Sequence, residues 1–451
     1  MRLVPVDVTF CRATTRLRWA FLTLSAVVVV SFFAFPGAAA NSASCRVSVA
    51  SYTADLAHCL KRAKSGRVSS IVLANGTYPG MLDASRRHFS SDVAIVGSRS
   101  VNLASGINMS DSSHLALSGV SVKPAAGGSA VIDWTGNAAD LTLNGVLVDG
   151  SKSLDGGARV KTSRSATDLV IKNSRFTQCG HGLMCIDLGP ANFTIAGNVF
   201  SPCEQCNFLK GRAAGTAGAI IRGNRFGSIY KKPGCVSKGP GRCIHLDAIH
   251  MEGGGPWMIT GNRFADCGHN PNGSTPDGDC TGDVFLGDLS GTMHDVTIAN
   301  NIFRGKTNRA VLIGNYRPTL EPVSIVNNTF MNSGGSPSVM LLQNWEAAGG
   351  GPQPNAPVVA NNIESYGSDT VCSRSRHYSN LVIAGTACPS NGNGDADAHG
   401  SPLLDASLAP TKRSTLVIGK ADPAYAPATD IFGRRRAGRT DRGAIQYVAH
   451  P

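Results

Sequence analysis

The sequence predicts an all-β chain wound as a parallel solenoid, and three observations support this fold class. Glycine is abundant, at 52 of 451 residues, whereas aromatic residues make up only 6% of the chain. No stretch carries a sustained helical period. Short apolar segments separated by Gly and Asn recur along the chain, and such self-similarity indicates stacked coils that each pair only with their neighbours.

Residues 1–40 are expected to be a secretion signal. Four Arg residues (Arg2, Arg12, Arg16 and Arg18) precede the apolar run WAFLTLSAVVVVSFFAFPGAAA, whose small residues suit cleavage after about Ala40. An uncleaved membrane anchor is the alternative, but the apolar core from Ala20 to Phe35 is short for a span and ends at Pro36. We therefore expect a secreted protein without membrane contact after cleavage.

The charge of the chain favours an acidic partner. Loss of residues 1–40 removes four Arg and one Asp and lowers the formal net charge from +12 to +9. Outside the cell, acidic polysaccharide is the natural polyanion for such a protein. Nucleic acid is not expected as a partner, because no recognisable Lys- and Arg-rich module is present. We expect a monomer.

Cysteine usage also fits an exported protein. Twelve cysteines remain once Cys11 leaves with the signal, and this even number implies disulfides. The expected local pairs are Cys45–Cys59, Cys235–Cys243, Cys267–Cys280 and Cys372–Cys388. Two arrangements stay open for the other four cysteines: Cys179–Cys203 with Cys185–Cys206, or Cys179–Cys185 with Cys203–Cys206.

Residues 41–66 are expected to form an N-terminal cap. The segment SYTADLAHCLKRAKSG (Ser51–Gly66) has helical spacing, which places Leu56, Cys59, Leu60 and Ala63 on one face. An amphipathic helix of this kind can cover the open edge of the first coil.

Residues 67–388 carry the repeat. Its copies read VIKNSRF, TIAGNVF, IIRGNRF, MITGNRF, TIANNIF, SIVNNTF and the degenerate VVANNIE, and they advance by 24, 26, 38, 39, 27 and 34 positions. Asn tolerates left-handed backbone, so its column is expected at sharp bends as a ladder of stacked amides (Asn198, Asn224, Asn262, Asn301, Asn328 and Asn362). The Phe column is expected to stack in the core (Phe176, Phe200, Phe226, Phe264, Phe303 and Phe330).

From about Val68 to Ala387, this pattern resembles the right-handed parallel β-helix proteins of the pectate-lyase-like superfamily. The resemblance implies a single-stranded, right-handed parallel β-helix of about 10–12 coils. Residues 389–451 resemble the capping tail of secreted bacterial β-helix proteins, with Asp430-x-x-Gly-x-x-Arg436 followed by Gly-Ala. The superfamily includes lyases, hydrolases, epimerases and adhesins, so the resemblance does not imply one activity.

A polar cluster lies in CIHLDAIHMEGGGPW (Cys243–Trp257), between the two longest spacings of the repeat. Long insertions in solenoids collect on one face, often the binding face. Strand alternation predicts that Ile244, Leu246, Ile249 and Met251 point inward and that His245, Asp247, His250 and Glu252 point outward. Aligning the next two strands on Ile249 adds Asp283, Asp288 and Arg309 to this outer face.

The same segment resembles a His-x-Asp-x-Ile-Gln pattern followed by Gly-Gly-Gly-Pro-Trp in secreted β-helix proteins of actinobacterial type. His245, Asp247, Ile249 and residues 253–257 match this pattern, whereas His250 stands in place of Gln. The resemblance supplies no reaction and assigns no role to position 250.

The cluster predicts a carbohydrate-active enzyme, and a lyase acting on uronate-containing polysaccharide is the leading hypothesis. A lyase needs a group that neutralises the substrate carboxylate and a base that removes the adjacent ring proton. The expected catalytic residues are His245, Asp247, His250 and Arg309. Hard oxygen ligands suit Ca²⁺, the expected cofactor, at Asp247, Glu252, Asp283 and Asp288. The expected substrate contacts are Glu252, Trp257, Asp288 and Asn315.

Two alternatives remain from the sequence. A glycoside hydrolase would pair Asp247 with Asp283 or Glu252 across the scissile bond. A non-catalytic β-helix would use the same face for glycan binding or surface adhesion, with the polar side chains forming hydrogen-bond ladders on a solvated sheet.

Overall fold

A computed structural model of the chain describes residues 43–124, 131–150, 159–163, 165–179, 184–189, 191–204, 206–211, 219–230, 246–267, 280–287, 294–305, 309–314, 321–332, 337–342, 355–390, 395–436, 438 and 440–448. The expected secretion signal (1–40) lies outside these ranges. Among the described residues, no helix is both long enough and apolar enough to span a membrane.

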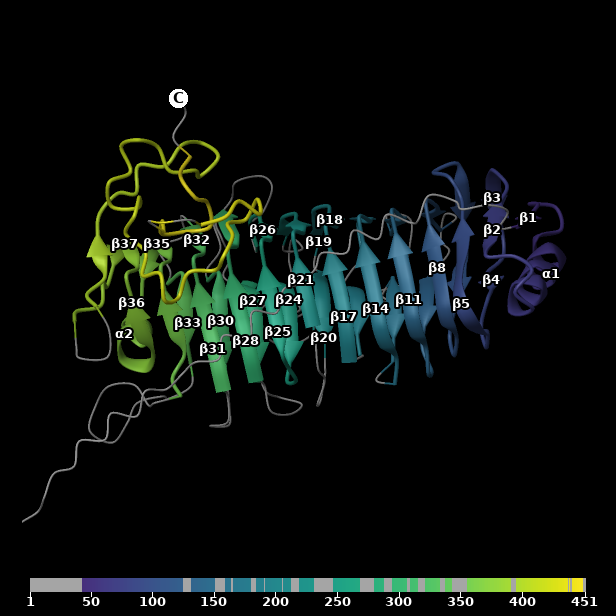
Figure 1. Cartoon of the computed structure of the whole chain (residues 1–451), viewed down its shortest axis with the longest axis horizontal. Coiled ribbons are helices and arrows are strands. Elements are labelled where there is room, and N and C mark those ends of the chain that lie inside the picture. The colour runs from purple at the N-terminus through teal and green to yellow at the C-terminus, as the bar shows by residue number, and fades with distance from the viewer. Residues whose placement is uncertain are drawn as a thin grey trace, which may run out of the picture. The chain divides into compact units, whose positions relative to one another are not determined.

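Three parallel sheets, here named A, B and C, form the fold (Figure 1). In the described residues, sheet A has thirteen strands: β1 Ser44–Val47, β2 Ser70–Leu73, β5 His88–Val96, β8 Ser113–Ser118, β11 Ala139–Asn144, β14 Thr167–Lys172, β17 Ala191–Ala196, β21 Ala219–Arg222, β25 Trp257–Thr260, β28 His294–Ala299, β31 Glu321–Val326, β34 Val358–Ala360 and β36 Arg376–Tyr378.

Sheet B likewise has thirteen strands in the described ranges: β3 Gly76–Tyr78, β6 Val101–Leu103, β9 Ser121–Val122, β12 Leu147–Asp149, β15 Arg175–Thr177, β18 Val199–Phe200, β22 Arg225–Phe226, β26 Arg263–Phe264, β29 Ile302–Gly305, β32 Thr329–Asn332, β35 Ile363–Gly367, β37 Leu381–Gly385 and β38 Ala398–His399.

Sheet C shows ten strands in the part of the chain that is described: β4 Leu82–Asp83, β7 Gly106–Asn108, β10 Val131–Trp134, β13 Val160–Thr162, β16 Met184–Leu188, β20 Asn207–Gly211, β24 Leu246–Glu252, β27 Cys280–Gly287, β30 Val311–Gly314 and β33 Val339–Leu341. A short pair is formed by β19 Cys203–Glu204 and β23 Ile229–Tyr230, and the helices are α1 Tyr52–Lys64 and α2 Asp369–Arg374.

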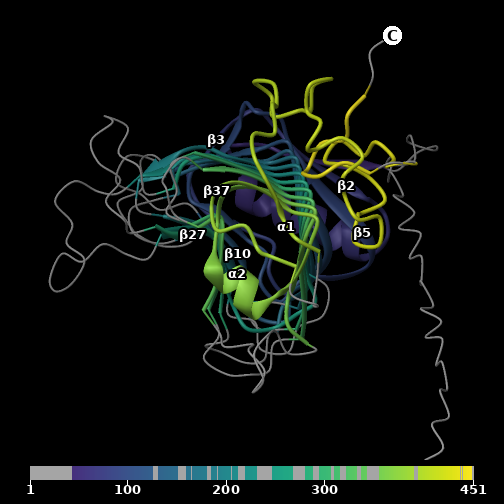
Figure 2. The same ribbon diagram turned by 90° about the vertical axis from the view of Figure 1, so that its left-hand side faces the viewer.

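The chain passes from sheet A to sheet B to sheet C and back, which is the path of a parallel β-helix. Figure 2 has the C-terminal coils nearest the viewer. In this view the chain runs from sheet A on the right over sheet B at the top to sheet C on the left, and each turn brings it closer to the viewer. This sense is right-handed. The predicted fold class, a right-handed parallel β-helix, is therefore confirmed.

Helix α1 forms as the apolar spacing predicts. Leu56, Cys59, Leu60 and Ala63 are its buried residues, and they join the same core cluster as the first coils. One rung precedes the helix, because β1 pairs in parallel register with β2. Its four residues lack the Gly and Asn bend of the repeat, so the sequence pattern did not reveal this rung.

The Asn ladder forms in the buried turn between sheets A and B. Asn262 shows the pattern: its Nδ2 donates to the Ile221 carbonyl at 2.9 Å and to Asn301 Oδ1 at 3.0 Å, while its Oδ1 accepts from Asn224. The left-handed bend predicted for these residues lies one position earlier, at Gly261 (φ 66°) and Asn300 (φ 55°). The ladder side chains are held by hydrogen bonds, and the residue before each one makes the turn.

Replacing Asn262 with alanine is expected to lower the free energy of unfolding by about 2–3 kcal/mol, because a buried Asn224 amide loses its acceptor. Urea denaturation of wild type and variant measures this loss. The control is Asn137→Ala, at an exposed turn position, which should change stability by less than about 0.5 kcal/mol. Equal effects at the two positions would show that the ladder does not contribute to stability.

The Phe stack also forms as predicted. Successive rings from Phe176 to Phe330 lie 4.6–4.9 Å apart and within 19° of parallel. All are at most 3% exposed. These aromatic residues therefore belong to the core and do not form a surface for ligand.

The disulfides resolve the question of pairing in favour of neighbours in sequence. Cys45–Cys59 and Cys372–Cys388 are present as predicted, and the local arrangement, Cys179–Cys185 with Cys203–Cys206, is the one observed. Cys267 is also disulfide-bonded. The predicted pair Cys235–Cys243 lies outside the described residues.

The C-terminal tail packs against the A–B turns of the last coils. Asn300, Asn327 and Asn361, the left-handed residues of those turns, donate their side-chain amides to the tail carbonyls of Thr429, Asp441 and Asp422. Leu408, Ala444 and Ile445 of the tail form an apolar cluster with Ile302. The tail is thus fixed to the flank of the β-helix by both hydrogen bonds and apolar contacts.

The Asp-x-x-Gly-x-x-Arg motif of the tail has a structural role. Arg436 is buried and donates to Asn300 Oδ1 at 3.0 Å and to the Gly443 carbonyl at 2.8 Å. Asp430 accepts from the backbone amides of Phe432 and Arg434, both at 2.9 Å. Asp430 therefore stabilises a turn at the start of the motif, and Arg436 at its end binds the tail to the coils.

Candidate functional site

The candidate site lies on β24 of sheet C. Its register against β27 shifts between Leu246 and Asp247, after which Ile249 pairs with Val284. This pairing is the alignment expected from the sequence. Leu246, Ile249 and Met251 are fully buried in the core, as predicted.

The three polar residues of this strand, Asp247, His250 and Glu252, form one hydrogen-bonded group, here called the His250 cluster. His250 Nδ1 lies 2.8 Å from Asp247 Oδ2, and His250 Nε2 lies 3.0 Å from Glu252 Oε1. The imidazole is therefore held at both nitrogens between two carboxylates.

These side chains occupy the face of β24 opposite the core residues Leu246, Ile249 and Met251, but this face is covered. Asp247 is 0% exposed, His250 5% and Glu252 6%. Burial is tolerated because each charged or polar group has partners close by. Alternation along the strand indicates only which face a side chain occupies, and it does not indicate whether that face is covered.

Neighbouring strands fix the orientation of Asp247 and His250. The Asp247 amide donates to Asn207 Oδ1 at 2.7 Å, and Asp247 Oδ1 accepts from the Gly282 amide at 3.1 Å. The Phe285 ring lies 4.7 Å from the imidazole, centroid to centroid. β20 thus holds the backbone of Asp247, whereas β27 holds its carboxylate and packs against the imidazole.

The cluster can hold a proton in two places. When both carboxylates are ionised, both ring nitrogens donate and His250 is a cation; when Glu252 is protonated, its O–H donates to a neutral Nε2. In both states Nδ1–H donates to Asp247. These two states hold the same number of protons and differ only in whether the shared proton lies on Nε2 or on Glu252. Only a neutral His250 beside an ionised Glu252 holds one proton fewer and can accept one at Nε2.

Lys210 is a member of the site that the sequence reasoning missed. It pairs in register with His250 on the preceding coil, and its Nζ lies 3.9 Å from Glu252 Oε1, with 21% of its side chain exposed. Aligning the earlier strand NFLKG on Ile249 through Leu209 would have found it.

Asp283, which alternates with the core residue Val284, is also buried, at 2% exposed. Burial raises the pKa of this carboxyl well above its ordinary value of 3.8, and the negative charges of Asp266 and Asp247 raise it further. Its surroundings therefore favour the protonated form of Asp283 over the ionised form. Its backbone amide donates to the Arg309 carbonyl at 3.3 Å, which places Arg309 on the adjacent coil.

The expected Ca²⁺ ligands do not converge within the described residues. No three His, Cys, Asp or Glu side chains there are arranged to hold a metal ion, and Asp247 and Glu252 both bind His250. Asp288, the fourth expected ligand, lies outside the described residues. Ca²⁺ binding stays a prediction, and none of the chemistry proposed below depends on it.

Trp257 is not available as a substrate contact. It begins β25 in sheet A, is 1% exposed, and packs against Phe193 with ring centroids 5.6 Å apart. Its apolar ring fills the core beneath the turn that follows β24. Of the other expected site residues, His245 and Asn315 lie outside the described residues.

No protein-family model matches this chain, and no curated protein matches it. Solved structures with a similar chain path include the catalytic domain of a GH87 alpha-1,3-glucanase in complex with nigerose (12% identity, TM-score 0.41, 80% of this chain and 69% of that chain). Others are the A-module of the Azotobacter vinelandii mannuronan C-5 epimerase AlgE6 (11%, 0.36, 79% and 100%) and a PL6 alginate lyase complex with trisaccharide (10%, 0.34, 80% and 85%).

Proposed function

We propose that the protein is a secreted carbohydrate-active enzyme that cleaves acidic polysaccharide by β-elimination. The observation that most supports this proposal is the imidazole of His250, held between two carboxylates beside the ammonium group of Lys210. This arrangement brings a proton acceptor and a cation together, and a uronate lyase requires both. The net positive charge of the chain suits an anionic polymer.

In this proposal, Lys210 neutralises the substrate carboxylate and acidifies the adjacent ring C–H. His250 accepts that proton at Nε2, which carries no proton before the step, and becomes a cation between the two carboxylates, while Asp247 holds Nδ1 in its protonated form. The C–H electron pair becomes a C=C bond, the C–O bond to the leaving sugar breaks, and the departing oxygen takes a proton from water. Lys210 is the most exposed of these groups, so substrate is expected to approach from its side.

Replacing His250 with glutamine is expected to lower the rate of formation of unsaturated sugar ends at least 100-fold, as for the loss of a general base. The readout is ultraviolet absorbance during incubation with pectate, alginate and other polyuronates. The control is His114→Gln, a histidine of sheet A whose side chain is 39% exposed. Full activity in a folded His250→Gln protein would refute the proposed role.

One observation favours a second candidate, a non-catalytic glycan-binding protein. The His250 cluster is at most 6% exposed, as expected for polar groups that serve only to tie neighbouring coils together. That function predicts tight polyuronate binding without cleavage, unaffected by His250→Gln. A glycoside hydrolase is less well supported, since Asp247 and Glu252 contact the same imidazole instead of facing each other across a sugar. A hydrolase would release reducing sugar ends that carry no C=C bond.

A further inference from the structure

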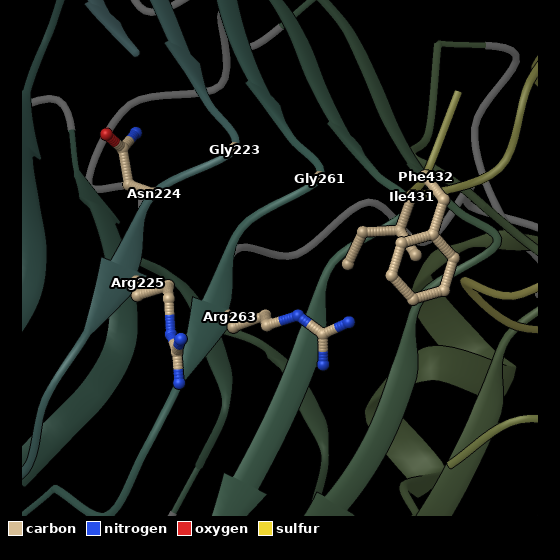
Figure 3. A pocket seen from close by; sticks show the side chains of 7 residues that line it. All are labelled: Gly223, Asn224, Arg225, Gly261, Arg263, Ile431 and Phe432. Atoms are coloured by element: carbon tan, nitrogen blue, oxygen red, sulfur yellow. The ribbon is translucent and has the colours of Figure 1, made fainter. Parts of the chain in front are cut away.

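A basic pocket lies at the boundary where the C-terminal tail stops covering the A–B turns. Its volume is about 410 Å³, and its lining comprises Gly223, Asn224, Arg225, Gly261, Arg263, Ile431 and Phe432. Figure 3 shows Arg225 and Arg263 side by side on neighbouring strands, with Ile431 and Phe432 of the tail facing Arg263. The pocket belongs to β22 and β26 of sheet B, whereas the His250 cluster belongs to sheet C.

The turn residues explain why a pocket forms here. In the last coils, Asn300, Asn327 and Asn361 occupy the left-handed turn position and bind the tail through their amides. In the two preceding coils the same position is Gly223 and Gly261. A side-chain atom at Gly261 would lie 3.9 Å from Ile431, so the absence of side chains leaves the floor of the pocket open.

The two arginines carry charge that the described residues do not neutralise. Arg225 and Arg263 are direct neighbours in the β22–β26 ladder, and neither has an ion-pair partner among those residues. Burial and the positive charge of Arg225 both lower the pKa of Arg263. A bound anion would relieve this repulsion, and two adjacent guanidinium groups match the geometry of a carboxylate.

Phe432 provides an apolar wall in an unusual position. It is 57% exposed, yet the guanidinium carbons of Arg263 and Arg434 lie 5.3 and 4.9 Å from its ring centre. Asp430 holds the turn that presents this ring and also pairs with Arg434 at 2.6 Å. The ring and Arg263 are therefore held in place before any ligand arrives, which lowers the entropic cost of binding.

We propose that this pocket binds a carboxylate-bearing sugar unit of an acidic polysaccharide, at a site separate from the His250 cluster. Arg225 and Arg263 hold the carboxylate, and the exposed face of Phe432 packs against the C–H face of the sugar ring. The inference shares its ligand class with the proposed function but does not depend on cleavage. Such a site would hold the polymer on one flank while another segment of it reaches sheet C.

The test is calorimetric titration of the full chain carrying His250→Gln with oligogalacturonate and with oligoalginate. Adding Arg225→Gln and Arg263→Gln should weaken binding of at least one of these oligomers about 10-fold or more, since two charge-assisted hydrogen-bonding groups are lost. The matched control, Arg175→Gln with Arg222→Gln, removes the same charge at exposed positions outside the pocket and should cost less than about 3-fold.

Other outcomes overturn the inference. Equal losses in the pocket variant and the control would indicate a general charge effect. Pocket-dependent binding of inorganic sulfate or single-stranded DNA as tight as that of the uronates would indicate an unspecific anion site. Loss of cleavage in His250→Gln with unchanged binding in the pocket variant would leave the proposed function standing and remove only this site.

Discussion

Replacing Phe264 with alanine is expected to lower the free energy of unfolding by about 3–5 kcal/mol, the usual cost of emptying a buried aromatic position. Phe264 is 2% exposed and stacks on Phe226 at 4.8 Å and on Phe303 at 4.6 Å. Both contacts vanish with the ring. Because each coil contacts only its neighbours, the cavity would also separate the stack into two weakly coupled halves.

Urea denaturation followed by circular dichroism measures this effect. Phe432→Ala provides the matched control, since it removes the same ring from a position that is 57% exposed; its cost should stay under about 1 kcal/mol. A loss at Phe264 no larger than that of the control would mean that the stacked rings contribute little to holding the coils together. A broader urea transition in Phe264→Ala than in wild type would indicate chains in which only one half of the β-helix is unfolded.

The fold could be predicted because the copies of the repeat are similar enough to be recognised in the sequence. Every coil must bend at the same place, so Asn and Phe recur two positions apart, as in Asn262 and Phe264. Stacking in register then follows from backbone pairing alone. The left-handed conformation was assigned one residue too late, because Gly or Asn can stand at both neighbouring positions of the turn, as Asn300 and Asn301 show.

The candidate site could be located from the sequence but its environment could not. The pairing of β24 with β27 followed from the apolar pattern, whereas the burial of Asp247 and His250 depends on what covers sheet C. Trp257 was predicted as a substrate contact, although a Trp that begins a strand can equally fill the core. The contacts among Asp247, His250 and Glu252 depend on side-chain conformations that alternation does not determine.

The degenerate last copy of the repeat, VVANNIE, places a carboxyl group where the Phe stack would continue. Glu364 pairs in register with Phe330 on one side and Val382 on the other, and it is 2% exposed. Burial, and then the negative charge of Asp397, raise the pKa of Glu364 from its ordinary 4.5 to about 8. Asp397 is fixed nearby, because it accepts hydrogen bonds from the side chain of Asn380 and the backbone of Cys388.

Stability is therefore expected to fall as the pH rises. Between pH 4.5 and 8 the folded chain keeps a proton on Glu364 that the unfolded chain releases, so this contribution is complete below pH 4.5 and is lost as pH rises through 8. The difference is on the order of 4 kcal/mol. Glu364→Gln mimics the protonated group, so the variant should match wild type at pH 4.5 and exceed its stability at pH 9.

Urea midpoints of wild type and Glu364→Gln at both pH values measure this difference directly, and comparison of the two proteins cancels the titration of groups that do not interact with Glu364. Asp92→Asn, at a carboxyl whose side chain is 88% exposed, is the control and should leave the pH profile unchanged. Parallel profiles for Glu364→Gln and wild type would show that Glu364 ionises without cost in the folded chain. A weaker dependence of stability on pH in Glu364→Gln than in wild type would show instead that the last coils are held together by a neutral carboxyl group in the position of a Phe ring.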